Sequence, residues 1–99
     1  MIVIAGRIAV KPERRAEAER AALAMVEDTR REAGCRAYAF YADLVDPATF
    51  FVFEEWDSDE AIAAHFQTEH LARFQALAPA LLAAPPELER HVVAEATAM

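Results

Sequence analysis

The sequence predicts an α+β fold, in which one antiparallel sheet is covered by helices on one face. Two observations lead to this prediction. Short β-rich runs alternate with segments rich in Ala, Glu and Arg. In addition, only a short turn-forming segment separates the two central β-rich runs, as in a hairpin. The expected strands cover residues 2–10, 35–44, 50–56 and 87–96, and the expected helical segments cover 12–33 and 58–84.

The first half of the chain predicts a strand followed by a long helix. The run IVIAGRIAV at 2–10 ends at Lys11 and Pro12, and proline suits the first turn of a helix because its missing N–H costs nothing there. Segment 12–33 has strong helix composition and no internal breaker. Gly34 is expected to end the helix in the left-handed conformation. The packing face would consist of Ala18, Ala22, Met25, Val26, Thr29 and Ala33.

The middle of the chain predicts a hairpin. CRAYAFYADL at 35–44 and FFVFEEW at 50–56 have strand composition, and Asp46-Pro47 between them has turn chemistry. A link this short makes the two strands antiparallel neighbours.

The last third predicts two helical pieces and a final strand. Asp57 or Ser58 is expected to cap the first piece, and Thr68 to cap a second that runs to about Ala84, with a break near Gln67. Pro79 should bend or shorten the second piece. Pro85-Pro86 ends it, and ELERHVVAEA (87–96) forms the last strand, with Val92 and Val93 at its centre.

The element order is therefore β-α-β-β-α(α)-β, the ferredoxin-like arrangement, within one domain spanning residues 1–99. A sheet covered on one face should alternate apolar and polar residues. Here Phe50 and Val52 point one way and Phe51 and Phe53 the other, so both faces are apolar. We therefore expect a homodimer that packs through the uncovered sheet face.

Composition argues against several classes of function. The net charge of −7 and the pI near 4.8, without a basic stripe, argue against nucleic-acid binding. No apolar run approaches the roughly 20 residues that cross a membrane, and the N-terminal stretch does not resemble a signal peptide. Cys35 is the only cysteine, which fits a reducing compartment. The expected location is the cytoplasm.

Cofactor-binding motifs are missing. The only glycines are Gly6 and Gly34, so there is no glycine-rich phosphate loop, which argues against a tightly bound nucleotide or flavin. Ser58 is better explained as a helix cap than as a nucleophile, and Cys35 as a small buried hydrophobe.

The segment EEWDSDEAIAAHFQTEH (54–70) contains the candidate polar site. His65 and His70 are five residues apart, about 140° around a continuous helix, so they do not form the same-face pair of zinc proteins. A break near Gln67 would still bring them together, but the sequence favours no metal.

Three residues of this segment have competing interpretations. His65 lies on an apolar helix side, where it is either a packing residue or a base that faces a cavity. Trp56 at a strand end is typical of a core. Glu54 in a phenylalanine-rich strand needs a partner, and Arg7 and Arg36 on neighbouring strands are the candidates.

Four short motifs follow one another along the chain: Gly34, Cys35 and Tyr38; Glu54 and Trp56; Ala61 and His65; and Thr68, His70 and Phe74. In their order and spacing they resemble the antibiotic biosynthesis monooxygenase (ABM) family over essentially the whole chain. Val52 departs from the family pattern, which has phenylalanine there, and this departure bears on the shape of the pocket more than on the fold.

The resemblance implies a ferredoxin-like protomer, a dimeric α/β barrel, and one cavity per protomer between sheet and helices. Many such proteins oxidise quinol- or anthrone-like aromatics with dioxygen and without metal or flavin. On this reading His65 is the base or proton shuttle, and His70 and Glu54 are further catalytic contacts. The pocket would be formed by Tyr38, Trp56, Phe66, Phe74 and Arg36.

Other relatives leave alternatives open. Some degrade heme, but the chain has Gly6 and Gln75 near the positions of the asparagine and histidine used there, and it contains no asparagine. The remaining alternatives are a dimeric small-molecule-binding module without catalysis, and an isomerase or other proton-transfer enzyme that uses the same base.

Overall fold

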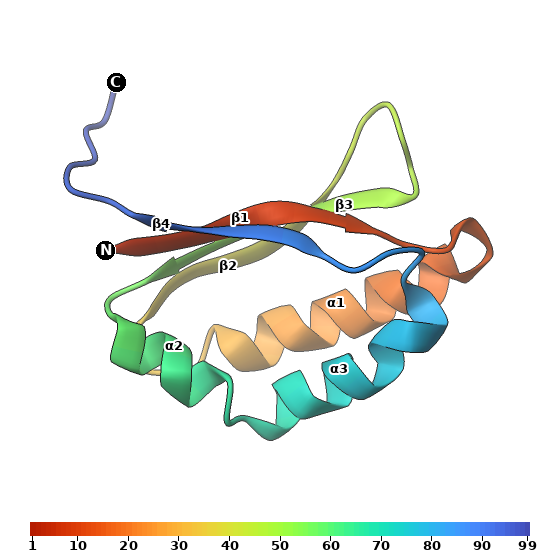
Figure 1. Ribbon diagram of the computed structural model, residues 1–99, viewed down its shortest axis with the longest axis horizontal. Coiled ribbons are helices and arrows are strands. Elements are labelled where there is room, and N and C mark those ends of the chain that lie inside the picture. Colours follow the sequence, from red (N-terminus) through yellow and green to blue (C-terminus); the bar gives the residue numbers. More distant parts are fainter.

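The computed structural model describes residues 1–99 as a four-stranded sheet with helices on one face (Figure 1). Helices α1 and α3 lie side by side against the sheet, and the short α2 lies at one end. The elements are β1 (Ile2–Ala9), the 3-10 turn η1 (Pro12–Arg14), α1 (Arg15–Thr29), β2 (Cys35–Ala42), β3 (Thr49–Trp56), α2 (Asp59–His65), α3 (Glu69–Leu81) and β4 (Glu87–Val92).

The strand order is β2-β3-β1-β4, and every neighbouring pair is antiparallel. The predicted ferredoxin-like α+β fold is thereby confirmed. Strands β1 and β3 are central, so side chains on their helix-facing side are enclosed by neighbours on both flanks.

Several boundaries differ from the sequence prediction, most clearly those of the first helix and the last strand. The α-helix begins at Arg15, after the 3-10 turn that contains Pro12, and it ends at Thr29, before the predicted residue 33. The last strand ends at Val92, so Val92 and Val93 are not at its centre. Val92 pairs with Ile2, the first residue of β1, and beyond this pair Val93 N still donates to the carbonyl of Met1 at 2.9 Å, where the chain of β1 begins.

Gly34 is the only residue with positive φ, at 81°, so its predicted left-handed conformation is confirmed. It does not cap the helix, because α1 already ends at Thr29 and Gly34 lies in the turn just before β2. A side chain there would also bring a Cβ to 2.6 Å from the Cβ of Ala61 on α2. Gly34 thus permits both the turn and the close approach of α2 to the hairpin.

The core lies between the sheet and the helices. Along β3 every second residue is buried against the helices: Phe50, Val52, Glu54 and Trp56. Ile62 of α2 and Leu71 of α3 complete the packing at the same end. The buried side chains on this side include the carboxyl group of Glu54 and the imidazole of His65.

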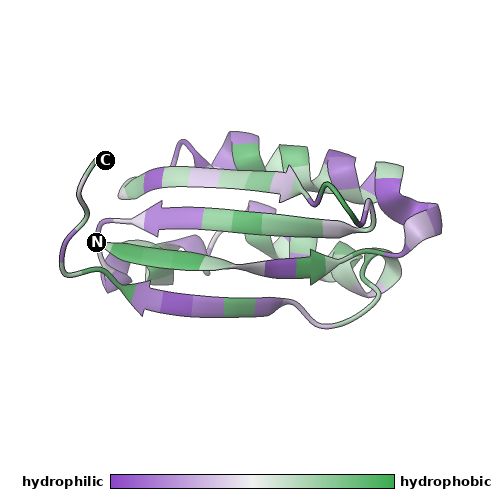
Figure 2. Cartoon of the chain, turned by 90° about the horizontal axis from the view of Figure 1, so that it is seen from above, coloured by the Kyte–Doolittle hydropathy of each residue, from purple (hydrophilic) through white to green (hydrophobic).

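The opposite sheet face carries no helix (Figure 2). Phe51 and Tyr41 are 41% and 58% exposed there, and Phe53 is half-buried. None of the helices is both long and apolar enough to span a bilayer.

Candidate active site

A cavity of about 320 Å³ lies between the helix-facing side of the sheet and helices α2 and α3. Its volume is at the lower end of the roughly 300–1,000 Å³ typical of small-molecule sites. Twelve of its sixteen lining residues are hydrophobic, and none is Lys or Arg. The residues with polar groups that face it include Glu54, His65 and Gln75, and its apolar walls include Ile4, Tyr38, Val52, Phe66, Phe74 and Leu88.

His65 is the last residue of α2, and only 4% of it is exposed. The hydroxyl of Ser58 accepts a hydrogen bond from Ala61 N at the other end of this helix, which confirms one of the two predicted caps. The imidazole packs against the Trp56 ring at a centroid distance of 4.9 Å and against Tyr38 at 5.9 Å. A strand end and a helix end together fix the orientation of the ring.

One carboxylate oxygen joins the two histidines. Glu32 lies in the turn between α1 and β2, and its Oε2 is 2.7 Å from His65 Nδ1 and 2.7 Å from His70 Nε2. The 140° separation expected on a continuous helix does not apply, because α2 ends at His65 and α3 starts at Glu69. Thr68 caps α3 by accepting from Leu71 N, and its hydroxyl donates to the carbonyl of His65 at 2.7 Å.

Glu32, His65 and His70 are residue types that can bind a metal ion, and their potential ligand atoms lie within 4.8 Å of one another. Nitrogen and oxygen ligands held tetrahedrally around Zn²⁺ at about 2.0–2.2 Å are roughly 3.3 Å apart. The 2.7 Å contacts of Glu32 are shorter and match hydrogen bonds. In this arrangement the cluster is a carboxylate shared by two imidazoles.

Glu54 has a different partner from the two predicted ones. Its Oε1 accepts a hydrogen bond from the Trp56 indole N–H at 2.9 Å, two residues along the same strand face. Arg7 is exposed, and Arg36 pairs with Asp57 on the surface. With no cation beside it, burial raises the pKa of the Glu54 carboxyl, although the Trp56 hydrogen bond and nearby His65 partly offset this.

Arg36 was predicted to line the pocket, and this was wrong. The pairing of β2 with β3 shifts register between Cys35 and Ala37, so Arg36 lies in a bulge, and its side chain is 52% exposed. The bulge turns the guanidinium away from the cavity. A sequence pattern of period two does not reveal such an extra residue.

The predicted aromatic residues have different positions relative to the cavity. Tyr38, Phe66 and Phe74 line it, and Phe66 is 57% exposed at its mouth. Trp56 is fully buried behind His65 and supports the site without lining it. Burial, together with the charge of Glu54, raises the pKa of Tyr38, so this residue stays a neutral phenol and is unsuited as a base.

His70, predicted as a catalytic contact, does not line the cavity. It lies in a separate groove of about 110 Å³ between α1 and α3, beside Asp28 and Arg73.

Burial raises the pKa of Cys35, which therefore remains a thiol, as its interpretation as a small hydrophobe requires.

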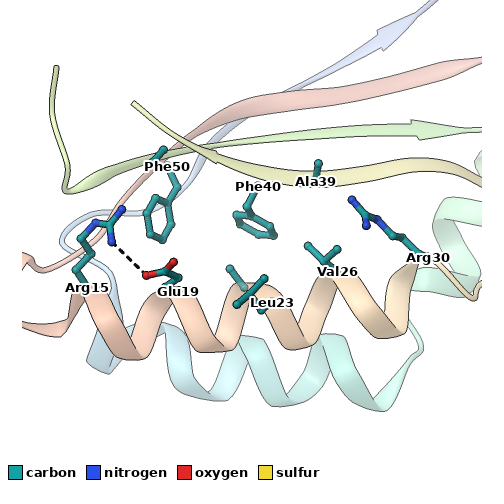
Figure 3. A pocket seen from close by; sticks show the side chains of 10 residues that line it. Arg15, Glu19, Leu23, Val26, Arg30, Ala39, Phe40 and Phe50 are labelled. Atoms are coloured by element: carbon teal, nitrogen blue, oxygen red, sulfur yellow. Dashed lines mark hydrogen bonds and ion pairs between the residues drawn. The ribbon is translucent and has the colours of Figure 1, made fainter. Parts of the chain in front are cut away.

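A second hollow of about 250 Å³ lies between α1 and β2 (Figure 3). Its charged groups are already paired: Arg15 binds Glu19 and the carbonyl of Pro47, and Arg30 donates to the carbonyl of Tyr38. This hollow contains no histidine, so the groups suited to proton transfer lie in the cavity of His65.

Comparison with known protein families shows which family the chain belongs to. The profile of the family described as antibiotic biosynthesis monooxygenase (ABM) matches residues 1–77. The chain belongs to the ABM family. The match covers β1 through most of α3, which includes all the predicted site residues.

Individual proteins are similar to this chain over nearly its whole length. Protein sll1783 of Synechocystis is 38% identical over 95% of this chain, which spans 64% of that protein's length. The Bacillus subtilis protein named "Putative monooxygenase YcnE" is 34% identical over 96% of this chain and its own full length. The structure of PA3566 from Pseudomonas aeruginosa has a TM-score of 0.88 at 30% identity, and covers 95% of this chain and 94% of its own.

Glu32 is the site residue that sequence reasoning missed. It lies within EAGCRAY, a stretch that resembles the ABM family, two residues before Gly34. In one sequence it is a glutamate near a helix end like several others. Its contacts to His65 and His70, 33 and 38 residues away, exist only in the folded chain.

Proposed function

We propose that this ABM-family protein is a cofactor-independent monooxygenase that oxidises a quinol- or anthrone-like aromatic with dioxygen. The observation that supports this most directly is the state of His65. The imidazole is buried, its Nδ1 is engaged by Glu32, and its Nε2 has no hydrogen-bond partner within the chain while the ring lines an apolar cavity. Such a nitrogen is suited to accept a proton from a bound hydroxyl.

The proposed reaction begins when His65 takes the proton of an electron-rich phenol or enol. The resulting anion passes one electron to dioxygen, and the substrate radical and superoxide combine to a peroxide anion at a substrate carbon that still bears a hydrogen. The protonated His65 returns its proton to this peroxide. Loss of water from that peroxide leaves a carbonyl, so one oxygen atom enters the product and the other becomes water. The protein contributes the base, orientation and exclusion of water.

The cavity also favours a neutral substrate. No Lys or Arg lines it, so a phosphate or carboxylate would be buried without a counter-charge. This argues against the isomerase alternative for any substrate that carries a phosphate. Aromatic walls from Tyr38, Phe66 and Phe74 instead provide flat apolar contacts for an aromatic ring.

We also propose that the working form is a homodimer that packs through the uncovered sheet face. Phe51, Phe53 and Tyr41 are apolar residues on that face with no cover from their own chain. Sedimentation equilibrium at low micromolar concentration should give about twice the chain mass of 11.0 kDa. A folded monomer under these conditions would contradict the proposal.

The test of the reaction is oxygen consumption with a panel of hydroquinones and anthrones. Replacing His65 by Ala should lower turnover by about 10²-fold or more, because the base is lost. Melting temperature is measured in parallel, since loss of a packing histidine would lower stability instead. Binding of these compounds without oxygen uptake would support the non-catalytic alternative. An unchanged rate per folded His65→Ala molecule would return His65 to a packing role.

A further inference from the structure

We infer that Glu32 and His70 are positioning residues for the base: Glu32 holds the proton of His65 on Nδ1, and His70 holds Glu32 in place. The role in turnover rests on the proposed function. The arrangement of protons is a property of the resting protein and is testable without any substrate.

The contact with Glu32 determines the tautomer of His65. An ionised carboxylate only accepts hydrogen bonds, so the 2.7 Å contact from Glu32 Oε2 requires an N–H at His65 Nδ1. In a neutral imidazole the other nitrogen, Nε2, then carries the lone pair. Without Glu32 nothing in the chain keeps the proton on Nδ1, and a proton on Nε2 would prevent this nitrogen from acting as the base.

Glu32 also provides a negative charge beside the imidazole of His65. When His65 accepts a proton it becomes an imidazolium in a nearly dry position, with 5% of its side chain exposed. The Glu32 carboxylate, at 2.7 Å and 12% exposed, stabilises that cation more than water-exposed charges can. The geometry matches the general logic in which a buried carboxylate orients a histidine base and stabilises its protonated form.

His70 contacts Glu32 from outside the cavity. It faces the groove between α1 and α3 and is absent from the cavity lining, so it does not contact a substrate held there. Its Nε2 donates to the same Oε2 of Glu32, from the first turn of α3. The turn after α1, the end of α2 and the start of α3 are thus joined at one oxygen atom. Removal of His70 leaves Glu32 with one anchor instead of two.

The spectroscopic test measures the ¹⁵N shifts of His65 in the substrate-free protein. Wild type should show the Nδ1–H tautomer, and Glu32→Ala should shift His65 toward Nε2–H. In Glu32→Gln the amide oxygen still accepts from both imidazoles, so this variant should keep the wild-type tautomer without the negative charge. Glu27→Gln, an exposed glutamate with no partner, is the matched control and should change nothing.

The kinetic test separates kcat from KM. Glu32→Ala should lower kcat on the order of 10²-fold and leave KM nearly unchanged, because Glu32 does not line the cavity. Glu32→Gln and His70→Ala should each cost roughly tenfold in kcat. His70→Gln should recover most of its loss, since the glutamine amide can donate to Glu32 where alanine cannot.

Two results would overturn the inference. One is a Glu32→Ala protein that keeps the His65 tautomer, whatever its activity. The other is stoichiometric Zn²⁺ binding that shifts both imidazoles, is lost in Glu32→Ala, and is needed for turnover, which would make the cluster a metal centre. If wild type consumes no oxygen with any compound, the proposed reaction fails while the tautomer measurement still decides the role of Glu32.

Discussion

The two faces of strand β3 differ in what surrounds them. On the helix side Val52, Glu54 and Trp56 are 1%, 6% and 0% exposed, and the two polar side chains bond to each other. On the other side Phe51 is 41% exposed and Phe53 is half-buried, although both are large and apolar. On one face, therefore, the side chains of this strand are enclosed and hydrogen-bonded within the candidate site. On the other face they form an apolar surface that the chain does not cover.

This difference shows that the usual rule, with apolar side chains buried and polar side chains exposed, fails on both faces of this sheet. The enclosed face contains the carboxylate of Glu54, and the imidazole of His65 packs against that face from the end of α2. Both can be buried because each has a partner, Trp56 for Glu54 and Glu32 for His65. The open face has apolar side chains that nothing in the chain covers. A site explains the first departure from the usual pattern, and the proposed dimer explains the second.

The largest expected effect is on the enclosed face. Replacing Trp56 by Ala should lower the free energy of unfolding by about 3–5 kcal/mol, because it removes a fully buried ring and leaves Glu54 without its donor. Denaturant unfolding at one fixed protein concentration measures this. Trp56→Phe, which keeps an aromatic ring, should lose clearly less. Equal losses would mean that the hydrogen bond, and not the ring, dominates.

A smaller effect is expected on the open face, in association. Phe51→Asp should weaken the dimer by at least about 2 kcal/mol, roughly 30-fold in its dissociation constant, because it places a charge in an apolar interface. Sedimentation equilibrium over a concentration series measures the shift. Leu44→Asp, which makes the same change at a fully exposed hairpin position, is the control. If both variants associate as tightly as wild type, the open face of the sheet is not the dimer interface.

The smallest effect is a change in how stability depends on pH. Burial raises the pKa of Glu54 above its ordinary value of 4.5, so the folded protein binds this proton more tightly than the unfolded chain. The stabilisation from this group is complete below about pH 4.5 and is lost as pH rises through the folded-state pKa. Glu54→Gln, whose amide oxygen can still accept from Trp56, should therefore gain stability over wild type at pH 7.

That gain should disappear on acidification below the ordinary glutamate pKa, where Glu54 is protonated in both the folded and the unfolded chain. Thermal melting of both proteins at several pH values makes the comparison. The exposed Glu60→Gln is the matched control and should show no such pH dependence. A wild-type protein that becomes more stable relative to Glu54→Gln as pH rises would contradict the direction of the shift.

The sequence by itself determined the fold and most of the candidate residues. Strand runs, helix composition, the Asp46-Pro47 turn and Gly34 each act over a few residues, so their local preferences are legible without a structure. His65 also stood out, because an ionisable residue on an apolar helix side is a local anomaly. The same holds for Glu54 among phenylalanines.

The tertiary structure alone decided which partners these residues have. The bulge at Cys35 and Ala37 moved Arg36 out of the cavity, and the neighbouring Trp56 took the place expected of an arginine beside Glu54. Glu32 joins His65 and His70 through contacts across more than thirty residues. Such contacts depend on the packing of the α1–β2 turn, the end of α2 and the start of α3 against one another. A pattern of near neighbours carries no information about that packing.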